Sequence, residues 1–123
     1  MAWHGLSAPV DDKLDIKAFE EAAWSKALIL PPSPPNAVMS TAFGHIFSGG
    51  YAAGYYGYKW AEVLDADAFA AFKEVGIFDR KVAGRFRREI LERGDTADAM
   101  ELYVAFRGHE PDIAPLLKRT GLV

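Results

Sequence analysis

The residues best suited to chemistry lie together in one stretch, residues 43–60, where histidine, glycine and tyrosine alternate. The stretch reads Phe-Gly-His-Ile-Phe-Ser-Gly-Gly-Tyr-Ala-Ala-Gly-Tyr-Tyr-Gly-Tyr-Lys-Trp and places four tyrosines within eight residues. On a helix, Tyr51, Tyr55 and Tyr58 would fall at positions i, i+4 and i+7 and line one face. Their rings could pack as core, which is the usual role of an aromatic stripe, or their hydroxyls could donate hydrogen bonds to a ligand.

The glycines of this stretch favour a ligand site. Gly49 and Gly50 permit a sharp turn, and glycines inside a helix cost stability, so their number indicates close approach of another backbone or a ligand. His45 by itself is either a packing histidine or a polar group of that site.

Composition excludes several other classes of function. The chain has 123 residues, no cysteine and a formal net charge of -3. No thiol nucleophile, disulfide or thiolate metal site can therefore exist, and the charge argues against nucleic acid or anionic lipid as a partner. The sequence contains no signal peptide and no apolar run of membrane-spanning length, so we expect a cytoplasmic protein with no membrane partner.

Helical periodicity and capping residues predict an all-α, helical bundle-like fold that positions this stretch. In the helix expected at about 15–28, Glu20 lies on the solvent side. Asp65 and Asp67 are expected to cap a break between two helices. The further helices are predicted at about 51–65, 68–75, 80–93, 98–106 and 112–119. Three regions follow: an N-terminal helix region (1–30), a proline-rich connector (31–36) and a helical segment (37–123).

The stretch from Phe43 to Val63 resembles the C-terminal signature of the family of thimet oligopeptidase, oligopeptidase A and peptidyl-dipeptidase Dcp. The resemblance continues in the same order through residues 64–69, 85–91 and 106–111, and covers about residues 28–122. It implies the C-terminal portion of a zincin-type oligopeptidase, in which zinc bound by an H-E-x-x-H motif hydrolyses peptides.

The resemblance also implies roles for individual residues. His45 and Tyr58 match residues that act on the transition state. The residues expected to bind peptide substrate are His45, Gly49, Gly50, Tyr51, Tyr55 and Tyr58.

The zinc motif itself is absent from the sequence. The only His-Glu pair is His109-Glu110, Pro111 follows it, and Ile113 stands where the second histidine would be. We therefore expect no cofactor in this chain alone, zinc in the complete family enzyme, and no hydrolysis without the missing N-terminal catalytic portion. A piece cut from a larger body exposes apolar surface, so a homo-oligomer is also expected. The alternative is a non-catalytic helical module that binds a peptide or a protein.

Overall fold

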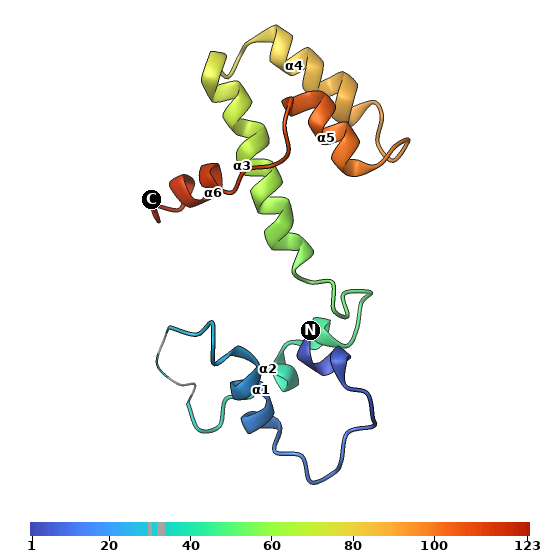
Figure 1. Ribbon diagram of the computed structural model, residues 1–123, viewed down its shortest axis with the longest axis vertical. Helices are drawn as coiled ribbons and strands as arrows, with labels where there is room; N and C mark the ends of the chain where they lie inside the picture. Colours follow the sequence, from blue (N-terminus) through green and yellow to red (C-terminus); the bar gives the residue numbers. More distant parts are fainter. Residues whose placement is uncertain (30, 32–33) are drawn as a thin grey trace. The chain divides into compact units, whose positions relative to one another are not determined.

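The regular elements of the protein are helical (Figure 1). The computed structural model describes residues 1–29, 31 and 34–123, and no β-strand occurs among them. The predicted all-α fold class is confirmed. The elements in chain order are η1 (Ala2–Gly5), α1 (Ile16–Trp24), α2 (Met39–Ala42), η2 (Gly44–Ile46), α3 (Gly57–Val75), α4 (Arg80–Phe86), the π-helical turn η3 (Arg87–Leu91), α5 (Ala99–Arg107) and α6 (Ala114–Arg119).

The chain divides into two compact units, Met1–Tyr56 and Gly57–Val123. The predicted connector at 31–36 lies inside the first unit, and residues 30, 32 and 33 fall outside the described residues. In the described part of that connector, the Lys17 ammonium donates hydrogen bonds to the carbonyls of Pro34 and Pro35 at 2.9 and 3.1 Å. The division of the chain at this connector stays a prediction.

The first unit is organised by aromatic contacts between its N-terminus and α1. The Trp3 ring lies 4.4 Å from that of Phe19 and 6.1 Å from that of Phe47, centroid to centroid. Asp15 caps α1 by accepting a hydrogen bond from the amide of Ala18, as its place before an apolar-periodic segment suggests. The prediction that Glu20 faces solvent is wrong: its side chain is buried, because it bonds to a segment 19 residues further on.

Helix α3 differs from the prediction at its start and at its middle. It begins at Gly57 rather than near residue 51, and it runs without a break to Val75. Asp65 and Asp67 therefore do not separate two helices, and Asp67 is instead one of the most deeply buried side chains of the second unit. Gly76, with φ 114°, ends the helix in a conformation that favours glycine.

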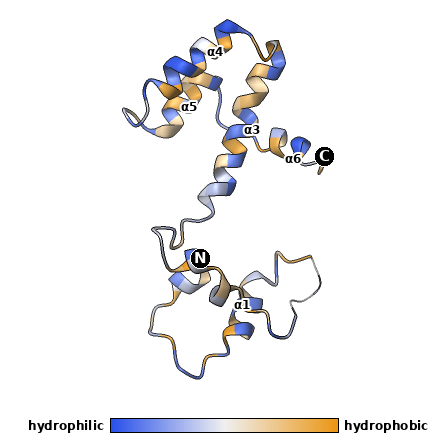
Figure 2. Cartoon of the chain, turned by 180° about the vertical axis from the view of Figure 1, so that it is seen from behind, coloured by the Kyte–Doolittle hydropathy of each residue, from blue (hydrophilic) through white to orange (hydrophobic). Residues whose placement is uncertain are grey.

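The second unit is held together by α3, α4 and α5. Ala71, Val82 and Phe106 form its buried centre, and the ring of Phe86 lies 5.2 Å from that of Phe106. Helix α6 packs against α3 (Figure 1). Hydrophobic and hydrophilic stretches alternate along the helices (Figure 2), as expected where one face of each helix is buried.

The helix ends of the second unit follow the capping residues of the sequence. Asp79 accepts hydrogen bonds from the amides of Lys81 and Val82, both at 2.9 Å, and so caps α4. Asp98 does the same for α5, whose other end is closed by Gly108 at φ 88°. These observations confirm the helices predicted near 80–93, 98–106 and 112–119, with the first of them passing into η3 after Phe86.

Candidate functional site

The tyrosine-rich stretch is built from turns before it becomes helical. Gly49 and Gly50 have φ values of 72° and 76°, and Ala53 also lies in the left-handed region with φ 53°. The left-handed residue Ala53 would interrupt a helix that started at Tyr51, and α3 begins only at Gly57. The prediction that Tyr51, Tyr55 and Tyr58 share one helical face is therefore wrong.

The turns nevertheless bring three predicted site residues together. The ring of His45 lies 5.1 Å from that of Tyr51 and 5.3 Å from that of Tyr55, and the two tyrosine rings are 5.8 Å apart. Phe43 packs edge-on against Tyr55 with a centroid distance of 4.6 Å. We call His45, Tyr51 and Tyr55 the aromatic triad.

Gly49 lies directly against the aromatic triad. A Cβ atom at this position would come within 3.4 Å of Tyr51 Cδ2 and 4.0 Å of His45 Cδ2, and its positive φ already disfavours any other residue. Around Gly50 a side chain would meet nothing within 4 Å, so there only the positive φ of 76° calls for glycine. These neighbours of Gly49 are side chains at ordinary contact distance, so the close approach of another backbone or a ligand that the sequence suggested stays a prediction.

A small cavity of about 110 Å³ borders the triad. It brings residues from the start of the chain next to the tyrosine-rich stretch, which the sequence did not predict. Neither helical periodicity nor a motif points to Met1 and His4. The lining residues are Met1, His4, Ile46, Tyr51, Ala53, Tyr55 and Tyr56.

Tyr58 belongs to the other unit. It lies in the first turn of α3, and 52% of its surface is exposed. Its assignment to the site, like that of the other candidate residues, stays a prediction.

The described residues do not fit a zinc site. No group of three His, Cys, Asp or Glu side chains among them could hold a metal ion. His4 Nε2 is bonded to the Ile46 carbonyl at 2.7 Å and His109 Nδ1 to the Glu110 carbonyl at 2.6 Å. One ring nitrogen of each of these two histidines is thus hydrogen-bonded to a backbone carbonyl.

The second unit contains a buried ionic network that the sequence did not reveal. Asp67, 1% exposed, accepts a hydrogen bond of 2.6 Å from the Tyr103 hydroxyl and lies 3.5 Å from Arg107 Nε. Arg107 also bonds to Glu74 at 2.7 Å. Burial, followed by the hydrogen bond and the negative charge of Asp67, raises the pKa of Tyr103 well above its usual range. The network ties α5 to α3, and no local spacing could predict it because Asp67 and Tyr103 are 36 residues apart.

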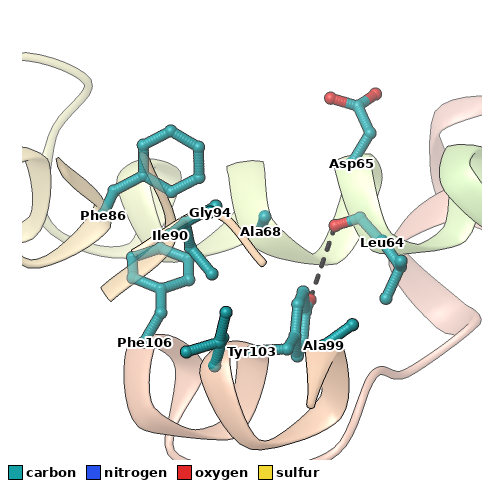
Figure 3. A pocket seen from close by; sticks show the side chains of 10 residues that line it. Leu64, Asp65, Ala68, Phe86, Ile90, Gly94, Ala99, Tyr103 and Phe106 are labelled. Carbon is teal, nitrogen blue, oxygen red and sulfur yellow. Dashed lines mark hydrogen bonds between the residues drawn. The ribbon is translucent and has the colours of Figure 1, made fainter. Parts of the chain in front are cut away.

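An apolar hollow of about 400 Å³ lies beside this network (Figure 3). The rings of Phe86 and Phe106 lie at one end, while Tyr103 reaches toward the backbone of Leu64, with 3.4 Å between its hydroxyl and the carbonyl oxygen. Its lining is almost entirely hydrophobic, and it contains none of the predicted site residues.

In the described part of the chain, none of the helices combines the length and the apolar character that a membrane span requires.

Comparison with known proteins gives a consistent result. The model of peptidase family M3 matches residues 1–122. A dipeptidyl carboxypeptidase of Salmonella typhimurium is 43% identical over 122 residues, which is 99% of this chain and 18% of that protein. Oligopeptidase A of Escherichia coli is 47% identical over 107 residues, 86% of this chain and 16% of that protein. A thimet-like oligopeptidase of Dictyostelium discoideum is 32% identical over 93 residues, 76% of this chain and 14% of that protein.

The chain thus spans less than a fifth of the length of these relatives. The resemblance drawn from the tyrosine-rich stretch extends over nearly all of its residues, and the chain belongs to peptidase family M3.

Proposed function

We propose that this chain is the peptide-binding part of an M3 metallopeptidase that hydrolyses short peptides. The observation that supports the proposal best is the aromatic triad, in which two phenols and an imidazole lie within 6 Å of one another beside a glycine turn. Such a cluster offers ring faces for substrate side chains and several hydrogen-bond donors for a peptide backbone. We assign peptide contact to His45, Gly49, Gly50, Tyr51, Tyr55 and Tyr58.

His45 and Tyr58 are proposed to act on the reacting carbonyl group. When a peptide bond is hydrolysed, its carbonyl oxygen gains negative charge, and a donor held at that oxygen stabilises the transition state more than the substrate. A phenol and an imidazole N–H can both serve. The metal of the complete enzyme would be held by residues outside this chain, so the chain alone is proposed to bind peptides without cleaving them.

Two measurements test this function. The chain alone is titrated with a fluorescein-labelled octapeptide and assayed with a quenched fluorogenic peptide, where we expect binding and no turnover. The chain is also substituted for the matching segment of Escherichia coli oligopeptidase A, and we expect the chimera to cleave the fluorogenic peptide. Turnover by the chain alone would contradict the proposal. An inactive but folded chimera, together with octapeptide binding by the chain, would instead favour a non-catalytic binding module.

We also propose that the chain self-associates. Val75, Ile77 and Phe78 are 59%, 54% and 89% exposed at the turn between α3 and α4, which leaves an apolar tip in contact with water. Light scattering across a concentration series should give a mass that rises above 13.5 kDa, and Phe78→Ser should lower it. A monomer mass at every concentration would contradict this.

A further inference from the structure

Glu20 has an unusual place for a carboxylate. It lies on α1 with 4% of its surface exposed, and its two oxygens accept hydrogen bonds of 2.9 Å from the amides of Met39 and Ser40. These amides open α2, where the residue at the N-cap, Val38, has no side-chain oxygen to accept them. Glu20 therefore caps α2 from a distance of 19 residues in sequence.

Continuous backbone hydrogen bonds link this cap to the aromatic triad. The amide of Phe43 donates to the carbonyl of Met39 at 2.8 Å, and the amide of Ile46 donates to that of Phe43 at 3.1 Å. The amide of Ser48 then donates to the carbonyl of Gly44 at 3.0 Å. His45 sits within these overlapping turns, so a shift of α2 also moves the imidazole.

A second attachment holds the far side of the same turns. His4 Nε2 donates a hydrogen bond of 2.7 Å to the carbonyl of Ile46, the residue after His45; Nε2 must be the donor because a carbonyl only accepts. The His4 ring also lies edge-on to Phe47, 5.8 Å away between centroids.

From these contacts we infer that Glu20 and His4 are positioning residues, which fix the His45 turn so that the imidazole faces Tyr51 and Tyr55. The inference rests on the proposed function, because the position of His45 affects the affinity for a peptide only if the aromatic triad binds that peptide. Preorganisation of this kind improves affinity by sparing the ordering of the loop when the ligand binds.

The charge of Glu20 supports this assignment. Burial raises the pKa of the carboxyl, but hydrogen bonds involving Ser40 and Met39 outweigh it and leave the pKa below its usual range. The carboxylate form can accept from both amides. A glutamine has nearly the same shape, but in place of one carboxylate oxygen it puts an NH2 group, which faces one of these amides as a second donor and cannot accept its hydrogen bond.

The test compares Glu20→Ala and Glu20→Gln in the full chain, with Glu21→Ala as the matched control. Glu21 is the neighbouring carboxylate on α1, where it is 44% exposed and 3.6 Å from Lys17. The readout is the set of nuclear Overhauser effects between the ring protons of His45 and those of Tyr51 and Tyr55. We expect them to vanish in Glu20→Ala, to weaken in Glu20→Gln and to persist in Glu21→Ala. Signals of Phe106 in the second unit should not change.

Octapeptide binding provides a second readout. We expect the dissociation constant to rise about tenfold in Glu20→Ala, by less in Glu20→Gln, and not in Glu21→Ala. His4→Phe keeps a ring against Phe47 but removes the N–H group that donates to the Ile46 carbonyl. It should also weaken the nuclear Overhauser effects between His45 and Tyr51. Glu20→Gln and His4→Phe keep the inference testable where Glu20→Ala unfolds the first unit.

Nuclear Overhauser effects of normal intensity between the His45 ring and the tyrosine rings in Glu20→Gln and His4→Phe would overturn the inference. This holds whatever the result for peptide binding. Failure of the unaltered chain to bind the octapeptide would overturn the proposed function, while the ring effects would still decide whether Glu20 and His4 position His45.

Discussion

At the residue scale, the two roles considered for the tyrosines are compatible. The rings of the aromatic triad pack against one another, which a core would also require, yet they do so in turns beside a cavity rather than within a helical bundle. Tyr55 remains 39% exposed. Packing therefore orients the rings while part of their surface stays exposed, as the proposed contact with a peptide requires.

Replacing Tyr58 tests the proposed role in stabilising the reacting oxygen. In the chimera with oligopeptidase A, Tyr58→Phe keeps the ring and removes one donor, so we expect kcat to fall by roughly 10- to 1,000-fold with little change in thermal stability. Tyr56→Phe is the control, since Tyr56 is not assigned to the substrate. Unchanged turnover with a lower melting temperature would show that the Tyr58 hydroxyl serves packing.

The buried ionic network leads to a prediction about stability. Arg107→Ala leaves the carboxylate of Asp67 without its cation, and we expect the free energy of unfolding to fall by about 3 kcal/mol. Arg119→Ala removes an ion pair to Asp65 whose side chains are 40% and 66% exposed, and it should cost at most about 1 kcal/mol. Urea unfolding of both variants measures the difference, and equal losses would contradict it.

At the scale of elements, the sequence predicted the helices whose ends are fixed by capping residues close to them in the chain. Asp79 and Asp98 accept from amides two and three residues further on, and Gly108 donates to a carbonyl four residues back, so the helices near them were placed within a few residues. The start of α3 was missed because left-handed residues, Ala53 among them, override the helical pattern of the tyrosines.

The errors at Asp67 and Glu20 have another physical cause. Asp67 was expected to cap a helix and Glu20 to face solvent, but each is buried and compensated by partners far away in sequence. Family resemblance suggested the three residues of the triad, and the structure shows that their rings are neighbours; their role in binding substrate stays a prediction. Its geometry and its support from the N-terminus became visible only in three dimensions.

Two glycines in neighbouring helices should respond in opposite ways to alanine. Gly108→Ala forces a side chain into the left-handed region at φ 88°, so we expect a loss of about 1 kcal/mol. Gly84→Ala lies inside α4, where the new Cβ would meet only the end of the Arg88 side chain at 3.3 Å, and we expect a gain of about 0.5 kcal/mol. Thermal unfolding of both variants checks the signs, and a loss in both would refute the distinction.

At the scale of the whole molecule, the division into two units has a direct consequence. The second unit contains the Phe106 core, the Asp67 network and the caps of α4 and α5, all within residues 57–123. We expect residues 57–123 expressed alone to stay helical and to unfold at the same urea concentration as in the full chain. Loss of amide dispersion in the NMR spectrum of the shortened chain would show that the first unit is needed for its fold.

The π-helical turn η3 has a consequence for the history of this gene. The amide of Glu92 bonds to the carbonyl of Arg87, five residues back, so the turn holds one residue more than an α-helix would. A gene that loses one codon here would convert the turn to an ordinary α-helix and leave Phe86 and the residues after Leu91 in phase. A codon lost within α3 would instead rotate every later residue of that helix by about 100°. A length difference of one residue between homologous genes is therefore accommodated more easily at η3 than inside α3.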